Sequence, residues 1–402
     1  MTTIINADTS GGLKLTSDTS GSLEIQSAGT TKLTIGSTSV DIPAIASVTS
    51  INGGQVGGSR NKIINGAMEI NQRGTAAVAA DGAMISDRWK EIEAGGGNMT
   101  CQVVADAPAS FRNSIKAIAS TADDCSQAAD EYRILHRIEG NNVVDLYYGN
   151  SGAKTTTLSF WVKSSLTGNF PVGLENSASN RTHVKQYTIN SADTWEKKSV
   201  TFVGDEAGTW LITNGIGLSV NFVLGAGSNY TGTIDSWQGS RLYRGSSSVQ
   251  FMATVNATYF VTGVQLEVGS TATDFEYRSF GEELALCQRY YEKSYDYDVA
   301  VGATTYIGMH LMGGNVAATA GTSHISGPTI PFQVPKRDNP TIVAYDQAGN
   351  SGKCQRFQLG NHNTDNQDIT VQSIGTNNFR YITSGSSNST GTQAHFTADS
   401  EL

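Results

Sequence analysis

The sequence is poor in charged residues, and this scarcity limits what the protein can bind. Of its 402 residues only 16% are Asp, Glu, Lys or Arg, against about 25% in an average globular domain. The net charge is −9, and the sequence contains no basic stripe of the kind that displaces counterions from a phosphate backbone. Nucleic acid is therefore not an expected partner, and the diffuse acidity is attributed to solubility.

Cysteine is also scarce, and its spacing excludes several kinds of site. The four cysteines, Cys101, Cys125, Cys287 and Cys354, are widely spaced and form no C-x-x-C motif. Free buried thiols are the expected state, and a bridge between Cys101 and Cys125 is the open alternative. The six histidines form no i, i+4 pairs. We expect no cofactor and no metal site within one chain, although copies of one histidine could meet on a trimer axis.

The chain has no long apolar run. No stretch approaches the ~18 consecutive apolar residues that predict a membrane span. Residues 1–6 lack the basic and apolar regions of a signal peptide. We therefore expect synthesis in a cytoplasm without export by the usual route.

Glycine, by contrast, is abundant, with 44 residues. Ser, Thr and Asn are the commonest polar residues, and 33 aromatic residues are spread through the middle and C-terminal parts. This composition is typical of an all-β protein with many turns and with surfaces of hydroxyls and amides. The fold class we predict is all-β.

Three short segments repeat at an interval of ten residues near the N-terminus. They are Leu13-Lys14-Leu15, Leu23-Glu24-Ile25 and Leu33-Thr34-Ile35. Alternation followed by turn residues predicts small strands. Two buried side chains per strand, at ~1.5–3 kcal/mol each, do not offset the ordering entropy of about ten residues. Residues 1–50 are therefore expected to form a short stalk completed by other copies of the chain.

The remaining chain is expected to hold two further β-domains. Residues 51–59 are a Gly-rich linker, and residues 60–280 are predicted to form a jelly-roll sandwich. Alternation places Leu158, Phe160 and Val162 on one face, and residues 218–224 and 260–268 are interpreted in the same way. Trp210-Leu211-Ile212 is interpreted as part of another strand. Residues 281–295 are expected to contain a connecting helix, and residues 296–402 a smaller distal sandwich.

Five segments carry a family resemblance. They are residues 61–74 (NKIINGAMEINQRG), 87–89 (DRW), 158–165 (LSFWVKSS), 261–269 (VTGVQLEVG) and 275–291, which contains FEYR and EELALCQRYY. Together they resemble a domain common in tail-fibre proteins of marine bacteriophages. The resemblance implies a virion structural protein, usually trimeric, with a jelly roll like that of carbohydrate-binding modules. It implies no catalytic residues, and residues from about 296 onward match it less well.

Four aromatic residues are candidates for a glycan site. Trp161 is the first, because alternation turns it away from the core together with Ser159 and Lys163; coverage by a loop or another subunit is the alternative. Trp237, Tyr230 and Tyr243 lie in a Gly/Ser-rich region and are weaker candidates. The other tryptophans are expected in the core: Trp89, Trp195 and Trp210.

Adjacent acids do not indicate a hydrolase. Glycosidases use two carboxylates about 5–9 Å apart, but neighbouring residues on a strand point to opposite faces, and acids in turns are usually solvated. The pairs in question are Asp123-Asp124, Asp205-Glu206 and Glu282-Glu283. We expect that the protein is not an enzyme.

The sequence thus predicts a homotrimeric tail fibre or related virion appendage that adheres to host polysaccharide or lipopolysaccharide. The N-terminus would attach to a tail or capsid component, and the tip would lie in residues 296–402. A purely structural fibre or adaptor without host contact is the alternative, and a polysaccharide depolymerase is a less favoured one.

Overall fold

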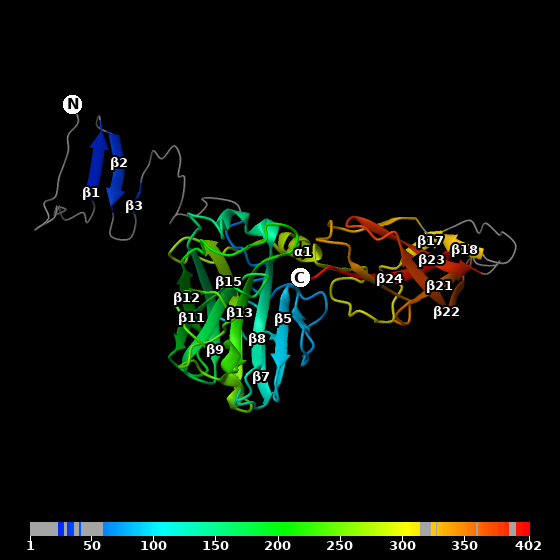
Figure 1. Ribbon diagram of the computed structural model, residues 1–402. Coiled ribbons are helices and arrows are strands. Elements are labelled where there is room, and N and C mark those ends of the chain that lie inside the picture. Colours follow the sequence, from blue (N-terminus) through cyan, green and yellow to red (C-terminus); the bar gives the residue numbers. More distant parts are fainter. Residues whose placement is uncertain are drawn as a thin grey trace, which may run out of the picture. The chain divides into compact units, whose positions relative to one another are not determined.

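The computed structural model describes residues 23–27, 30–35, 40–41, 59–313, 323–326, 328–358, 361–385 and 391–402. The chain divides into two compact units, Met1–Ile51 and Asn52–Leu402. Both are built from antiparallel strands (Figure 1), so the all-β prediction is confirmed. Within the described ranges, no helix has the length and apolar character needed to cross a membrane.

The first unit contains a small sheet of three strands in its described residues. The strands are β1 (Leu23–Ser27), β2 (Thr30–Ile35) and β3 (Val40–Asp41). The register pairs Leu23 with Ile35 and Ile25 with Leu33. Two of the three predicted repeat segments are therefore strands whose apolar positions lie opposite each other. The segment Leu13-Lys14-Leu15 lies outside the described residues.

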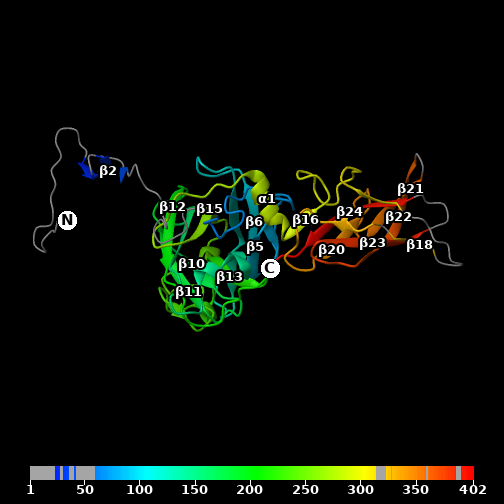
Figure 2. The same cartoon turned by 90° about the horizontal axis from the view of Figure 1, so that it is seen from above.

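The second unit begins with a jelly roll of two sheets that pack face to face (Figures 1 and 2). In the described residues one sheet has seven strands, in the order β14 (Trp237–Gln238), β11 (Thr182–Ile189), β10 (Gly168–Glu175), β13 (Ile216–Ala226), β8 (Glu131–Glu139), β5 (Trp89–Ala94) and β4 (Met84–Ser86). The other has five, in the order β12 (Glu196–Phe202), β9 (Thr156–Ser164), β15 (Thr258–Val268), β7 (Ser114–Thr121) and β6 (Asn98–Val104).

The core between these sheets follows the predicted alternation on most strands. Leu158, Phe160 and Val162 of β9 are buried there, and so are four apolar residues of β13, namely Leu218, Val220, Phe222 and Leu224. Trp89 is also a core residue, as expected. All four cysteines are buried and none forms a disulfide bond, so the expectation of thiols is confirmed and the bridge between Cys101 and Cys125 is not formed.

Strand β15 departs from the predicted alternation. Its register shifts between Thr262 and Gln265, and Gly263 there has a φ of 61°. The bulge moves the inward face, so that Val261 and Val264 both enter the core, whereas Phe260 lies outside the core cluster near Lys163. The expectation that Phe260 and Val264 share one face is therefore wrong, because one inserted residue reverses the side-chain order.

A single helix in the described residues follows the jelly roll. Helix α1 spans Phe280–Gln288, and Ser279 caps it by accepting a hydrogen bond from the Glu282 backbone N–H. Glu282 and Glu283 lie in the first turn, where carboxylates stabilise the positive end of the helix dipole. The next strand, β16 (Tyr291–Lys293), already pairs with the C-terminal strand β24.

The C-terminal part is a second β-structure whose described strands form one connected sheet. Its path is β16, β24 (Gly391–Asp399), β21 (Lys353–Gln358), β22 (Asn361–Gln372), β23 (Asn378–Gly385) and β18 (Ser323–Ser326). Three short strands join it, β17 (His310–Gly313) and β20 (Thr341–Tyr345) on β24, and β19 (Ile330–Pro331) on β23. Aromatic residues fill its core, with Phe332, Phe379 and Phe396 packed together.

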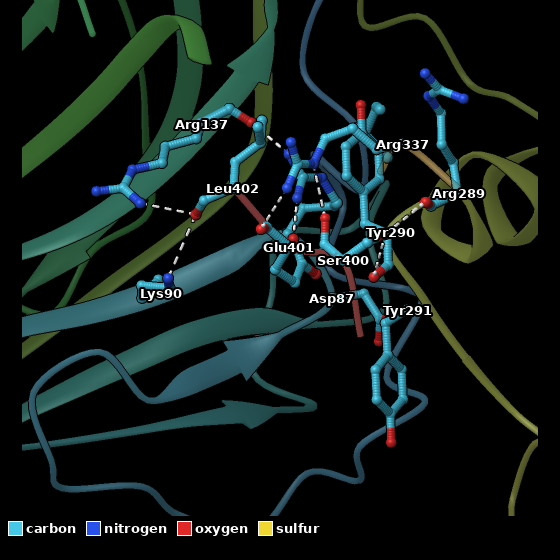
Figure 3. A network of polar contacts seen from close by, with 12 residues as sticks. Asp87, Lys90, Arg137, Arg289, Tyr290, Tyr291, Arg337, Ser400, Glu401 and Leu402 are labelled. Atoms are coloured by element: carbon cyan, nitrogen blue, oxygen red, sulfur yellow. Dashed lines mark hydrogen bonds and ion pairs between the residues drawn. The ribbon is translucent and has the colours of Figure 1, made fainter. Parts of the chain in front are cut away.

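The jelly roll and the C-terminal sheet meet through charged side chains that we call the junction network, shown in Figure 3. Arg88, 3% exposed, makes an ion pair with Glu401, and its guanidinium lies 3.5 Å from the centre of the Tyr290 ring. Arg73 bonds Asp399 at 2.9 Å and covers the Tyr291 ring in the same way. The two arginines thus connect jelly-roll loops to the last strand.

Backbone oxygens of the final residues complete this network. The Leu402 oxygen accepts hydrogen bonds from Arg137 at 2.7 Å and from Lys90 at 3.4 Å (Figure 3). Arg337 donates to the oxygens of Ser400 at 2.8 Å and Glu401 at 3.1 Å. All three donors are positively charged, so these hydrogen bonds to backbone oxygens are of the stronger, charge-assisted kind.

Two further ion pairs, each with a buried carboxylate, support the junction. Lys336 Nζ lies 2.6 Å from Glu292 Oε2. Glu139, at the end of β8, accepts hydrogen bonds from Arg289 at 2.6 Å and from the Tyr290 hydroxyl at 2.8 Å. Burial alone would raise the pKa of Glu139, but the hydrogen bonds outweigh it and lower that pKa.

Candidate functional site

Trp161, the first glycan candidate, lies on the outer side of β9. Leu158 and Phe160 are buried in the jelly-roll core, whereas Trp161 is half-buried. Its strand partners are Lys197 on β12 and Thr262 on β15. Its role as a sugar platform stays a prediction, with coverage by a loop or another subunit as the alternative.

Tyr230 and Tyr243 come together elsewhere, beside Val223 of β13. Their ring centres are 5.2 Å apart. Tyr243 is only 1% exposed; its hydroxyl accepts from Arg241 Nε at 2.6 Å and donates to Glu175 Oε1 at 3.3 Å. A ring buried in this way has no free face for a sugar, so the structure places Tyr243 in a packing role.

Trp237 belongs to an aromatic cluster at one end of the jelly roll. Its ring lies 5.3 Å from Trp210, 5.7 Å from Tyr148 and 5.1 Å from His183. Its indole N–H donates to the backbone oxygen of Val203 at 2.7 Å. Burial lowers the pKa of His183 to about 4, so this imidazole is neutral at pH 7 and supports the cluster as an apolar ring.

Two members of this cluster, Tyr148 and Trp210, line a pocket of about 130 Å³ that we call the apolar pocket. Its other lining residues are Val143, Val144, Leu146, Tyr147, Asn150, Leu211, Ile212, Gly217 and Leu218. Four of these side chains are exposed over more than a third of their surface: Val144, Tyr147, Leu211 and Ile212. Grouped exposed apolar side chains of this kind mark binding sites more often than chance placement does.

Tyr147 holds an unfavourable backbone conformation at the mouth of this pocket. It follows the short helix η2 (Val144–Leu146) with φ 59° and ψ 26°, in the left-handed region. Non-glycine residues avoid this region because Cβ crowds the carbonyl oxygen, and such strain is concentrated at functional sites. The chain keeps a tyrosine here, 53% exposed, where glycine would be favoured.

Gly149 lets the loop after Tyr147 approach the other wall. A Cβ at Gly149, whose φ is 82°, would lie 3.0 Å from the Gly208 oxygen and 3.1 Å from Trp210 Cδ1. The Gly149 N–H donates to the Asp205 oxygen at 2.7 Å. The absence of a side chain therefore allows Trp210 to pack edge-to-face against Tyr148, with their ring centres 4.9 Å apart.

The wall that carries Trp210 is a loop, so the strand interpreted for Trp210-Leu211-Ile212 is wrong. A buried ion pair fixes the start of the loop, because Arg181 donates to both oxygens of Asp205 at 2.6 and 2.7 Å. Asp205 is 2% exposed, which also corrects the expectation that turn acids are solvated. Trp210 is half-buried at the edge of the core instead of lying inside it.

A second hollow of about 420 Å³ adjoins the first, and Val144 lines both. We call it the polar pocket, and its remaining lining residues are Ser59, Asn61, Lys62, Ile64, Asn141, Asn142, Asp145, Arg278 and Leu286. Most of these residues carry an amide, a hydroxyl or a charge. The volume is within the range of about 300–1,000 Å³ that small-molecule sites usually have.

The charges of the polar pocket are arranged in compensated pairs. Lys62 Nζ lies 2.8 Å from Asp145 Oδ2. Arg278 donates to the Ile63 oxygen at 3.1 Å and pairs with Glu283 at 3.3 Å. Because the cations are already paired, the pocket favours neutral polar groups over a strongly charged ligand.

Together the two pockets offer complementary surfaces. A sugar ring carries both C–H faces and hydroxyls. The aromatic and aliphatic walls of the apolar pocket suit the C–H faces, and the amides and paired charges of the polar pocket suit the hydroxyls. No three His, Cys, Asp or Glu side chains in the described ranges gather as a metal site. The geometry therefore suits binding of a small polar molecule with apolar edges.

Sequence reasoning found Trp237 but missed Tyr147 and Tyr148, and it assigned Trp210 to the core. A usable signal is present, since Tyr147-Tyr148-Gly149-Asn150 places two aromatic residues directly before a turn pair. The contact between this loop and residues 205–215 depends on packing of segments about 60 residues apart, which no local pattern reveals.

Comparisons with known proteins give only distant likenesses. No protein-family model matches the chain, and no curated protein matches its sequence. Among solved structures, the chain is similar to the enzymatically active domain of tailspike protein 4 of bacteriophage CBA120. That likeness has 12% identity and a TM-score of 0.29, and it covers 52% of this chain and 21% of the tailspike chain.

Carbohydrate-binding modules are also among the similar structures. A CBM4 module aligns at 13% identity and a TM-score of 0.28, covering 51% of this chain and 97% of the module. The family 11 module of Clostridium thermocellum, in complex with a mixed-linked tetrasaccharide, aligns at 11% identity and a TM-score of 0.27, covering 50% of this chain and 99% of the module. TM-scores this low do not establish a shared function, so the case for glycan binding depends on the geometry of the two pockets.

Proposed function

We propose that the protein is a homotrimeric virion appendage, of the tail-fibre kind, that binds glycans on the host surface. The observation that supports glycan binding is that the apolar and polar pockets share a lining residue, Val144. One wall suits the C–H face of a sugar and the next suits its hydroxyls. The virion assignment rests on the five sequence segments that resemble marine phage tail fibres.

The proposed activity is adhesion without catalysis. Among the residues that line the two pockets, Asp145 is the only carboxylate, and it is paired with Lys62. A glycosidase mechanism needs a second carboxyl group across the bond to be cleaved. The pockets therefore supply contacts that hold a glycan, and we propose no bond cleavage.

The trimer is proposed because one site of this size binds weakly. A single sugar site with a dissociation constant of about 1 mM would supply only about 4 kcal/mol of binding free energy. Linking three copies raises the avidity by ~10²–10⁴ through effective concentration. In the N-terminal sheet, the apolar positions of β1 and β2 lie opposite each other within one chain, and we propose that copies of this small sheet pack together because it buries too little apolar surface by itself.

The test is binding of the full chain to a panel of bacterial surface polysaccharides, measured by calorimetry. We expect Trp210→Ala to weaken binding by about tenfold, a size typical of a central aromatic contact. Trp161→Ala is the matched control, because Trp161 is also half-buried but lies on β9 outside the pockets. Loss of binding with Trp161→Ala but not with Trp210→Ala would move the site to the outer sheet face.

The remaining parts of the proposal are tested separately. Sedimentation of the full chain is expected to give a trimer, and a stable monomer would overturn that claim. Incubation with the bound polysaccharide should release no reducing ends; release would show a depolymerase. If no polysaccharide in the panel binds, the adhesive function fails and the structural alternative remains.

A further inference from the structure

We propose that the apolar pocket receives the methyl group of a methyl-bearing sugar, either the C6 methyl of a 6-deoxyhexose or the methyl of an acetamido group. This inference rests on the proposed glycan binding and adds the class of sugar. It follows from the walls of the pocket, which are more apolar than a fully hydroxylated sugar would require.

The walls offer few free hydrogen-bonding groups. The Tyr148 hydroxyl is already bonded to Thr156 at 2.9 Å, and the Trp210 indole N–H donates to the Ala207 oxygen at 3.1 Å. Most other lining side chains are aliphatic. The Tyr147 hydroxyl and the Asn150 amide are the other polar side-chain groups, and the Asn150 amide donates to the Tyr148 oxygen at 3.3 Å. A sugar hydroxyl placed against these apolar walls would lose its hydrogen bonds to water without gaining others there, which is unfavourable. A methyl group in the same place would remove apolar surface from water.

The size of the pocket points to the same occupant. Its volume is about 130 Å³, well below the ~300 Å³ at which ordinary ligand pockets begin. It is therefore suited to one edge of a sugar ring. The rest of the ring would lie beyond Val144, where Lys62, Asn142 and Asp145 line the polar pocket.

The exposed rim of the pocket would complete the contact. Tyr147, with its left-handed backbone, and Ile212 both line the pocket, and 53% and 57% of their surfaces are exposed. A methyl group placed between them would contact the Ile212 side chain and the Tyr147 ring, whereas a hydroxymethyl group would find no hydrogen-bonding partner in the Ile212 side chain. The strain at Tyr147 is then explained by the position of its ring.

The test compares sugars that differ in one group, using saturation-transfer NMR and titration with the full chain. The pairs are L-rhamnose with L-mannose, L-fucose with L-galactose, and N-acetylglucosamine with glucose. We expect the methyl-bearing member to bind about tenfold more tightly in at least one pair, with the strongest saturation on its methyl protons. Preference in the first two pairs identifies a 6-deoxyhexose, and preference in the third identifies an acetamido sugar.

A matched pair of variants ties the preference to the pocket. Ile212→Asn adds a polar group to the rim and is expected to abolish the preference while hydroxyl-dependent binding remains. Val255→Asn is the control, since Val255 is 54% exposed and lies outside the pocket; its preference should equal that of the unchanged protein. Both residues are on the surface, so both variants are expected to fold.

Two failures can be told apart. If both members of every pair bind equally, or the hydroxylated member binds better, the methyl inference is overturned and glycan binding stands. If no sugar of the pairs and no surface polysaccharide binds, the proposed function itself fails. Equal loss of preference in Ile212→Asn and Val255→Asn would also overturn the assignment to this pocket.

Discussion

The junction network and the apolar pocket use their side chains in opposite ways. In the junction, charged groups such as Arg88 and Glu401 are nearly excluded from solvent and paired with one another. In the pocket, apolar side chains such as Val144 and Ile212 stay exposed, although burial would be favourable. The pocket also carries backbone strain at Tyr147.

This contrast separates a structural contact from a binding surface. A buried charge is tolerated only with its partner present, so the junction fixes two β-structures against each other within the second unit. An exposed apolar side chain can still be buried by a bound molecule, and that burial favours binding. We therefore expect changes in the junction to affect stability alone, and changes in the pocket to affect binding more than stability.

The largest expected effect is the loss of a buried cation near the junction. Lys336→Met keeps the aliphatic stem but leaves the Glu292 carboxylate buried without its counter-ion. We expect the free energy of unfolding to fall by about 3–5 kcal/mol, measured by urea denaturation, with sugar affinity unchanged. The control Lys353→Met removes an exposed pair with Asp368 and should cost at most about 1 kcal/mol. Equal costs in the two variants would contradict the distinction.

The next largest effect is expected at Glu91, a buried carboxyl group that has no ion pair among the described residues. Burial raises the pKa of Glu91 to about 9 from an ordinary 4.5, and Glu93 adds to this shift. Its stabilising contribution is full below pH 4.5 and is lost as pH rises to about 9. Between pH 7 and 9 stability should fall by up to about 1.4 kcal/mol per pH unit.

Glu91→Gln is expected to remove this alkaline loss, because the side chain can no longer ionise. Urea titrations at pH 7, 8 and 9 measure it, with the exposed Glu282→Gln as the control that keeps the loss. An identical pH profile for Glu91→Gln and the unchanged protein would show that another group titrates in this range.

A smaller effect is expected at Tyr243, where a buried hydroxyl connects Arg241 and Glu175. Tyr243→Phe should lower the free energy of unfolding by about 1–2 kcal/mol, because the two charged groups lose a buried partner. The exposed Tyr277→Phe also loses one hydrogen bond, to the Ser110 oxygen, and should cost less. Weaker sugar binding by Tyr243→Phe would instead assign Tyr243 to the glycan site.

The smallest stability change and a clear binding change are expected at Tyr147. Tyr147→Gly and Tyr147→Ala both remove the ring and should weaken sugar binding about tenfold. Only glycine relieves the left-handed strain, so the glycine variant should be more stable than the alanine variant by about 1 kcal/mol. Thermal unfolding of the two variants measures the difference. Equal stabilities would show that the backbone conformation at Tyr147 is unstrained.

The sequence predicted the fold more completely than the site. Alternation on β9 and β13 identified inward residues such as Phe160 and Phe222, because a period of two is set by local geometry. The same rule failed at β15, where Gly263 allows a bulge that alternation cannot reveal. Buried free thiols and the helix near residues 281–291 were also predicted from composition and local pattern.

Of the four predicted glycan residues, only Trp237 lies beside the pockets, behind Tyr148 and Trp210. Tyr243 is buried and hydrogen-bonded to charged residues, and the role of Trp161 remains a prediction. Aromatic residue type alone did not separate these cases, because exposure depends on which loop covers each ring.

By itself the sequence determined the all-β class and two strands of the N-terminal repeat, and it favoured thiols over a bridge between Cys101 and Cys125, since each follows from composition or from neighbours within a few residues. The tertiary structure alone decided the pockets and the junction. Both arise where segments far apart in the chain meet, as when the Gly149 turn approaches the Trp210 loop, and whether such groups are covered or exposed is settled only by packing.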